Sequence, residues 1–473
     1  LREPPVKDTG RAIAALFASP IQPSQGLALV TLALNRSISL MIGRPEFDPT
    51  SFVVGNIVLH AITTILLYHL LAALLARFSN PPFSGLLPIV MAALFAVHPL
   101  HTSSVPFPVQ RRGIMVAAFF TLGLLAYLKL RETKSAAYRF GWLALLLVAC
   151  WCCMKSKSIG IIMPLGIITI ELALQLANRR ALRRFLLWGG LLALVCVVLI
   201  FTHLWYQNLF NPKSMRLVLP EWGNALDLWP HFLTHMRIIW AYWAGTFFPL
   251  PAWLTPDHVV EPSLTLGDHF AWAALLGHVA MIVAAIYAGV RRWPLTCAGI
   301  LIFYVGMIPY PLLPQPEWMV EYRTYMPCVG VFIASTEFVN RVGRKIPRWT
   351  RAVAAVVAFA AMLTVTNERA FVYSDSLLLW KDAAAKSPTN HRAHSNLGLA
   401  YAKKKQFDDA IREYQESVRL QPNFPDGHFA LGLTFDQLQR YDDAIVTYRR
   451  AQALMPYDLA CHINIANALT SLG

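Results

Sequence analysis

Long apolar stretches separated by polar turns dominate the chain as far as residue 366. Ten of them suggest membrane helices, although the shorter ones must extend into flanking polar sequence to reach the roughly 20 residues of a crossing. They cover residues 51–76, 85–97, 112–130, 140–153, 157–177, 184–204, 268–290, 294–314, 323–340 and 350–366. The pattern predicts an all-α membrane bundle over residues 51–366, with a large outer loop at 205–267.

A different period begins after the last apolar stretch. Pro388, Pro422 and Pro456 are spaced 34 residues apart, which is the length of one tetratricopeptide repeat. The Leu-Gly, aromatic and Ala positions of that repeat are filled by Leu397, Gly398, Tyr401, Ala410 and Tyr414, and then by Leu431, Gly432, Phe435, Ala444 and Tyr448. An α-solenoid is therefore predicted at 367–473, with a degenerate repeat at 374–388, full repeats at 391–424 and 425–458, and a truncated one at 459–473. Such arrays bind segments of other proteins, which predicts a protein partner; a spacer role is the alternative.

The composition agrees with a polytopic membrane protein, since 56% of the residues are hydrophobic and only 14% are charged. The net charge of +15 is explained by its placement and does not indicate nucleic-acid binding. Basic residues gather in alternate short turns, namely Lys129, Arg131, Lys134, Arg139, Arg179, Arg180, Arg183, Arg184, Arg291, Arg292, Arg341, Arg344, Lys345, Arg348 and Arg351.

The positive-inside rule assigns these turns to the cytosol. Residues 1–50, the 205–267 loop and the repeat arm then lie on the outer side, and residues 1–50 would follow a first membrane helix that precedes Leu1. This orientation suits a bacterial inner membrane with the arm in the periplasm. A protein of the endoplasmic reticulum would show the same pattern.

Polar motifs recur on the predicted outer side. His98 and His101 flank Pro99, and Gln110 and Arg111 open the next span. The two histidines could line a site or ligate a metal, or they could cap a helix end. A cation such as Arg111 beside a helix N-terminus suits an anionic phosphate.

Lysines interrupt two apolar helices at the next outer turn. Lys155 and Lys157 alternate with Ser156 and Ser158, and lysine at membrane depth marks either a binding site or a side chain that reaches to the interface. Two cations and two hydroxyls at a helix N-terminus predict phosphate binding.

A third outer motif has Glu321 and Arg323 on either side of Tyr322. A local salt bridge between the two charged residues is one interpretation. In the other, Arg323 holds a donor phosphate and Tyr322 packs beside it. Arg237 lies three residues before Trp240 on an expected amphipathic helix and is a further site candidate.

Other chemistries find no support. The sequence has no dinucleotide-binding fingerprint, P-loop or nucleophile elbow in a suitable context. Its cysteines and histidines lack the spacing of a metal or haem site, so none is predicted from them.

In their order along the chain, the His98–His101, Gln110–Arg111, Ser156–Lys157 and Glu321–Arg323 motifs and the repeat array resemble the transmembrane and tetratricopeptide-repeat O-mannosyltransferases and their bacterial relatives. The resemblance implies a C-type glycosyltransferase fold that takes a sugar from a polyprenyl-phosphate donor on the outer membrane face. The implied acceptor is an outward-facing group, a protein hydroxyl.

The same resemblance implies residue roles. Arg111, Lys157 and Arg323 would bind the donor phosphate, joined by Lys155 from the same lysine turn, and a carboxylate of an acidic pair would act as general base. That pair is expected at or before Leu1, with Asp8 as the candidate in the present sequence. A divalent metal cofactor is left open. The alternative is a catalytically inactive membrane scaffold whose repeats organise partner proteins.

Overall fold

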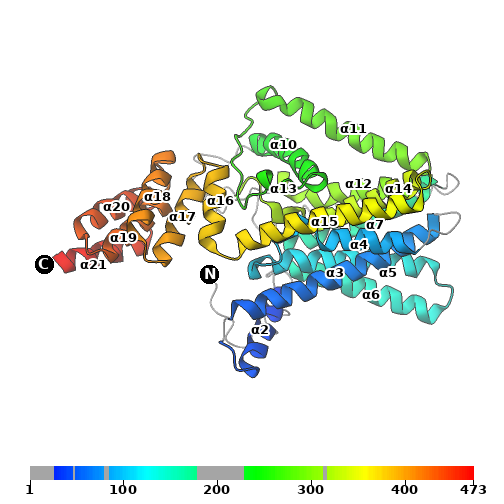
Figure 1. Cartoon of the computed structure of the whole chain (residues 1–473), viewed down its shortest axis with the longest axis horizontal. Helices are drawn as coiled ribbons and strands as arrows, with labels where there is room; N and C mark the ends of the chain where they lie inside the picture. Colours follow the sequence, from blue (N-terminus) through cyan, green and yellow to red (C-terminus); the bar gives the residue numbers. More distant parts are fainter. Residues whose placement is uncertain (1–25, 46–47, 79–84, 178–227, 313–316, 473) are drawn as a thin grey trace.

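The structure, a computed structural model, describes residues 26–45, 48–78, 85–177, 228–312 and 317–472. These residues are helical almost throughout, and the extended pairing among them is an isolated bridge between His258 and Met319. The predicted all-α architecture is confirmed. A bundle of long helices leads into a row of shorter antiparallel helices that extends away from one end of it (Figure 1).

Apolar helices build the bundle. They are α2 (Gly26–Met41), α3 (Pro49–Phe78), α4 (Leu86–Ala96), α5 (Arg111–Glu132), α6 (Ala136–Ser156), α7 (Met163–Ala177), α10 (Leu228–Phe247), α11 (Ala271–Val290), α12 (Pro294–Met307), α13 (Pro309–Leu312), α14 (Tyr325–Gly343) and α15 (Arg348–Tyr373). Short 3₁₀ turns include η1 (Pro99–Ser103), η2 (Pro108–Gln110), η3 (Ser158–Ile162) and η7 (Glu321–Thr324). In the described ranges, 8 helical stretches are long and apolar enough to cross a membrane.

Those 8 stretches coincide with eight of the ten apolar stretches recognised in the sequence. The stretch at 323–340 forms α14, which is buried along most of its length and is not among the 8. The stretch at 184–204 lies outside the described residues.

Two helices occupy segments that the sequence pattern assigned to the outer side. The 16 residues of α2 are apolar but shorter than a crossing, so a hydropathy pattern does not register them as a span. Within the 205–267 loop, α10 has Leu233, Ile238 and Ile239 buried against the bundle. Helices α2 and α10 are therefore packed parts of these outer segments, and α10 carries residues that support the candidate site.

Helices α12 and α14 pack closely against each other through two facing glycines. A Cβ at Gly299 would lie 2.3 Å from the carbonyl oxygen of Gly330, and one at Gly330 would lie 2.5 Å from the carbonyl oxygen of Gly299. Small residues let membrane helices approach closely and gain van der Waals contact along their length. Ile302, Phe303 and Ile333 are fully buried beside these glycines.

The basic turns lie at the end of the bundle away from the arm (Figure 1). Two of them are joined there, since the Arg341 guanidinium stacks 4.5 Å from the ring centroid of Trp293. The turn containing Arg179 to Arg184 lies outside the described residues. The expected separation of basic turns from the arm is thus present in the described parts of the fold.

The arm consists of α16 (Ser376–Lys386), α17 (His391–Lys403), α18 (Phe407–Leu420), α19 (Pro425–Gln437), α20 (Tyr441–Leu454) and α21 (Leu459–Leu472). The helix pairs α17–α18 and α19–α20 are the two full repeats. In each pair, the glycine of the first helix packs against the tyrosine ring of the second. A Cβ added at Gly398 would lie 2.9 Å from Tyr414, and one added at Gly432 would lie 2.6 Å from Tyr448, so a larger residue would not fit.

Polar contacts fix the arm to the bundle. Arg392 Nε forms an ion pair with Asp257 Oδ2 at 3.0 Å, and Asn390 Nδ2 donates to the same carboxylate at 3.2 Å. Lys386 Nζ donates to the carbonyl oxygen of Leu254 at 2.9 Å. The first repeat is therefore docked on the loop that follows α10.

Candidate functional site

Three cationic side chains from distant parts of the chain meet at the arm end of the bundle. Lys157 lies in the turn between α6 and η3, Arg323 lies in η7, and Arg112 is in the first turn of α5. Burial, together with the nearby charges of Arg323 and Arg112, lowers the pKa of Lys157 to about 8. The Lys157 ammonium is 5.7 Å from the ring centroid of Tyr322. We call Arg112, Lys157 and Arg323 the basic cluster.

The loop before α14 is built around the Arg323 guanidinium. Its Nη1 donates to the carbonyl oxygen of Trp318 and its Nη2 to that of Glu317, both at 2.9 Å, and its Cζ is 5.0 Å from the ring centroid of Tyr310. Glu317 is also its carboxylate neighbour, at 3.5 Å, in place of the local pair with Glu321. One carboxylate beside three cations gives the cluster a net positive charge that suits an anion.

Helix α10 supports this loop from behind. The Tyr242 hydroxyl donates to the carbonyl oxygen of Val320 and accepts from its N–H, each at 3.1 Å. The rings of His231 and His235 pack against Trp318 at centroid distances of 5.5 and 5.9 Å. These contacts fix the backbone around Trp318 and Val320, to which Arg323 is hydrogen-bonded nearby, and so hold the Arg323 cation in place before any ligand binds.

Arg111 has a different environment from its neighbour Arg112. It is only 1% exposed, and its guanidinium donates to Asn56 Oδ1 at 2.8 Å, to Asn35 Oδ1 at 2.5 Å and to the carbonyl oxygen of Phe52 at 2.9 Å. These acceptors belong to α2 and α3, so Arg111 ties three helices together. Its expected role in phosphate binding remains a prediction, with most of its donors already bonded within the protein.

The two histidines of the His98–His101 motif have different environments: His98 caps a helix, and His101 is a buried ring. His98 Nδ1 accepts from the N–H of Leu100, and its Nε2 donates to the carbonyl oxygen of Thr246 at 2.9 Å, which confirms the capping interpretation for His98. His101 is buried against Phe95 and Tyr325, each at a centroid distance of 4.5 Å. Within the described ranges, no group of three or more His, Cys, Asp or Glu could hold a metal ion, so we derive no step through one.

The remaining sequence candidates are spread around the arm end. Arg237 donates to the carbonyl oxygen of Glu261 at 2.9 Å and to Ser263 Oγ at 2.8 Å. Gln110 ends η2 at the start of α5, and Lys155 is in the last turn of α6. Asp8 and the segment around Leu1 lie outside the described residues, so the expected general base is not placed.

Glu321 faces the junction with the arm. It is 3% exposed, its Oε2 accepts from the Tyr373 hydroxyl at 3.4 Å, and its Oε1 has no hydrogen-bond partner. Burial raises the pKa of this carboxyl to about 7, although Arg369 nearby acts in the opposite direction. Arg369 itself reaches the arm through Asp382 at 2.7 Å.

Glu321→Gln is expected to stabilise the protein more at pH 8.5 than at pH 5.5. A raised carboxyl pKa means that the folded state loses stability as pH rises, by about 3 kcal/mol once Glu321 is ionised above pH 7. Thermal midpoints of both proteins in detergent, measured across this range, test the effect. Glu368→Gln, an exposed position on α15, should show no such trend; an equal midpoint difference at both pH values for Glu321→Gln would contradict the assignment.

The fold and the cluster together define a class: a polytopic membrane bundle with a cluster of basic residues at the end next to a helical-repeat arm. A family model described as Tetratricopeptide repeat matches residues 373–423 and 397–458, and so confirms the repeat assignment.

Curated relatives add a distant similarity to known proteins. Protein O-mannosyl-transferase tmtc2 of Xenopus laevis is 32% identical over 116 residues, covering 24% of this chain and 13% of the relative. Protein O-mannosyl-transferase TMTC2 of Mus musculus is 31% identical over 137 residues (28% and 15%). Protein O-mannosyl-transferase TMTC4 of Homo sapiens is 33% identical over 112 residues (22% and 14%). The matches thus span a small part of these relatives, and they agree with the resemblance carried by the sequence motifs.

Proposed function

We propose that this protein transfers a sugar from a polyprenyl-phosphate donor to a protein hydroxyl on the outer side of the membrane. The observation that carries the proposal is the basic cluster: Lys157 lies over the Tyr322 ring, and the charges of Arg323 and Arg112 are near enough to lower its pKa. Buried cations are costly and persist where they are paired or serve a ligand. A lipid phosphate can reach such a cluster along the bundle while its isoprenoid chain stays in the bilayer.

The cluster would contribute to the reaction by stabilising negative charge on the leaving phosphate. The acceptor oxygen forms a bond to the anomeric carbon of the sugar while the bond from that carbon to the donor phosphate oxygen breaks. The electron pair stays on the phosphate, whose added charge Lys157 and Arg323 stabilise. The acceptor proton passes to a base, for which the region of Asp8 and upstream sequence remains the prediction. A released polyprenyl phosphate then leaves into the bilayer.

The arm is placed to bring an acceptor to this end. Its first repeat docks through Arg392 on Asp257, and the charges of Asp257 and Glu317 are close enough to affect each other. The relatives are named as protein O-mannosyl-transferases, which supports a protein acceptor. We place the arm and the cluster on the outer side of the membrane, because the basic turns lie at the opposite end. In a bacterial inner membrane, one of the two locations that fit the sequence, this is the periplasmic side.

Lys157 gives a direct test of donor binding. Affinity of the full chain in nanodiscs for a radiolabelled polyprenyl-phosphate hexose should fall about tenfold between pH 7 and 9, since deprotonation near pH 8 removes one of the cations. Lys157→Arg should keep the affinity constant over the same range, because arginine does not titrate there.

The pH profile also separates the active enzyme from the inactive scaffold. A wild-type affinity that is unchanged between pH 7 and 9, or an equal decline in Lys157→Arg, would remove Lys157 from the phosphate site. Binding that follows the expected profile without any transfer to hydroxyl-bearing peptides would favour the scaffold.

A further inference from the structure

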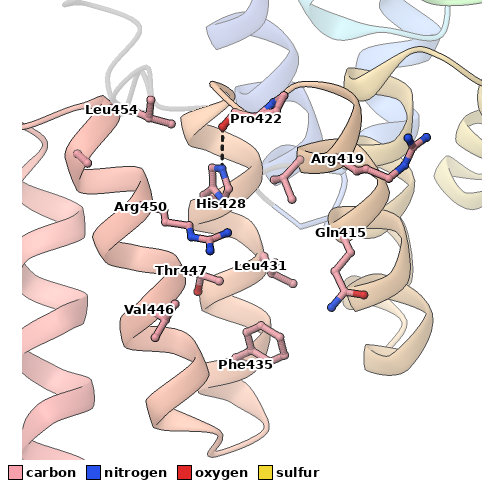
Figure 2. A pocket seen from close by; sticks show the side chains of 12 residues that line it. Gln415, Arg419, Pro422, His428, Leu431, Phe435, Val446, Thr447, Arg450 and Leu454 are labelled. Atoms are coloured by element: carbon pink, nitrogen blue, oxygen red, sulfur yellow. Dashed lines mark hydrogen bonds between the residues drawn. The ribbon is translucent and has the colours of Figure 1, made fainter.

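A groove on the repeat arm, remote from the basic cluster in sequence, contains an unsatisfied buried histidine. The groove has a volume of about 590 Å³ and lies between α18 and α20, the second helices of the two full repeats, with α19 as its floor (Figure 2). Leu431, Phe435 and Thr447 are buried along it, and Val446 is 54% exposed on its wall. Its charged lining residues are Arg419 and Arg450, both cationic.

His428 lies on the floor of this groove. It is 5% exposed, its Nε2 donates to the carbonyl oxygen of Pro422 at 2.9 Å, and its Nδ1 is buried without a hydrogen-bond partner. Leaving a buried polar atom unpaired costs about 1–3 kcal/mol. The arrangement therefore favours a ligand that pairs with Nδ1.

The preceding repeat indicates which chemical group fits this position. His394 occupies the equivalent position 34 residues earlier, and its Nε2 likewise donates to a proline carbonyl, that of Pro388, at 3.1 Å. Its Nδ1 is 2.7 Å from the carboxylate of Glu413. The position equivalent to Glu413 in the second repeat is Thr447, whose hydroxyl donates to backbone carbonyls of its own helix. The second repeat thus keeps the histidine and lacks its carboxylate.

We propose that this groove binds a segment of a partner protein whose Asp or Glu supplies the missing carboxylate to His428 Nδ1 and to Arg450, with an adjacent apolar side chain on Leu431 and Phe435. Figure 2 shows Arg450 extending from α20 toward α19, on the same groove as His428. The exposed valine and the two arginines suit an acidic, apolar segment better than a basic one. The site is independent of sugar transfer.

The test uses the full chain in nanodiscs. Ten-residue peptides are selected from a random display library, and the enriched peptides are measured by fluorescence anisotropy. We expect enriched peptides to pair Asp or Glu with an aliphatic or aromatic residue, and Glu→Gln or Asp→Asn in the peptide to weaken binding at least tenfold. Selection of basic or purely apolar peptides, or no enrichment at all, would overturn the proposal.

Variants of the chain locate the binding. Thr447→Glu restores the internal carboxylate of the preceding repeat and should weaken peptide binding at least tenfold, as should Arg450→Glu. Arg449→Glu makes the same change of charge one residue away, outside the groove lining, and should change affinity less than twofold. Equal losses in Arg449→Glu and Arg450→Glu, or full binding by Thr447→Glu, would contradict the site.

Two further measurements exclude other origins of binding. Arg323→Ala should bind the peptide like wild type even if transfer is lost. A dimer in light scattering that Arg450→Glu dissolves would identify a second copy as occupant and contradict a foreign segment.

Discussion

Arg323→Ala is expected to lower the rate of sugar transfer about 10²–10³-fold, which is the usual effect of removing one preorganised donor from a developing oxyanion. The guanidinium is held by two backbone carbonyls and a tyrosine ring, so it loses no freedom when it meets the phosphate. Transfer from a polyprenyl-phosphate hexose to a hydroxyl-bearing peptide, measured in nanodiscs, gives the rate. Wild-type transfer by the variant would remove Arg323 from the phosphate site.

Matched variants separate charge from support of the loop. Arg323→Lys keeps the cation but cannot bond both carbonyls and the phosphate, so its rate should lie between those of Ala and wild type. Lys157→Ala leaves the Arg323 contacts in place and should also slow transfer. Arg139→Ala, an exposed residue near the opposite end of the bundle, should transfer at the wild-type rate.

Gly330→Ala is expected to destabilise the bundle by about 3 kcal/mol or more. The added Cβ would lie 2.5 Å from the carbonyl oxygen of Gly299 and 2.7 Å from the backbone nitrogen of Phe303. Backbone atoms cannot move aside as a flexible side chain can, so overpacking here lies at the upper end of its usual cost. The thermal midpoint in detergent and the yield of monodisperse protein measure the loss.

Gly141→Ala is the matched control for this substitution. It lies on α6 with no atom within 4 Å of the added Cβ, and alanine favours a helix over glycine by about 1 kcal/mol. Its midpoint should equal or exceed that of wild type. If Gly330→Ala showed the same behaviour, the close approach of α12 and α14 would be wrong.

Local periodicity was enough to predict the repeats and most of the bundle. The 34-residue spacing of Pro388, Pro422 and Pro456 places six short helices, because each repeat packs only on its neighbours. The long helices are also predicted locally, because each one shows as a continuous apolar stretch. The 16-residue α2 falls below the length that hydropathy can recognise.

The composition of the site needed three-dimensional information. Lys157 and Arg323 were recognised as unusual cations, but Arg112, Tyr242 and Tyr310 were not singled out. Adjacent helical residues point about 100° apart, so only the packing of α5 against α2 and α3 decides that Arg111 is enclosed while Arg112 lies near Lys157. The adjacent arginines are visible in the sequence, but the sequence does not tell which of them is buried between helices and which lies near Lys157.

For the groove at His428, the sequence shows the key difference but not its meaning. Repeats are internal comparisons, and the replacement of Glu413 by Thr447 at the same repeat position is visible in the sequence. Its meaning depends on the hydrogen bonds of His394 and His428, which only the structure supplies.

A cryo-electron microscopy structure of the full chain in nanodiscs with a polyprenyl-phosphate hexose would show whether the distant polar motifs form one phosphate site at the arm end of the bundle. We expect phosphate density within hydrogen-bonding distance of Lys157 Nζ and the Arg323 guanidinium, with the isoprenoid running along the bundle. A headgroup bound among the basic turns at the opposite end would rule this site out.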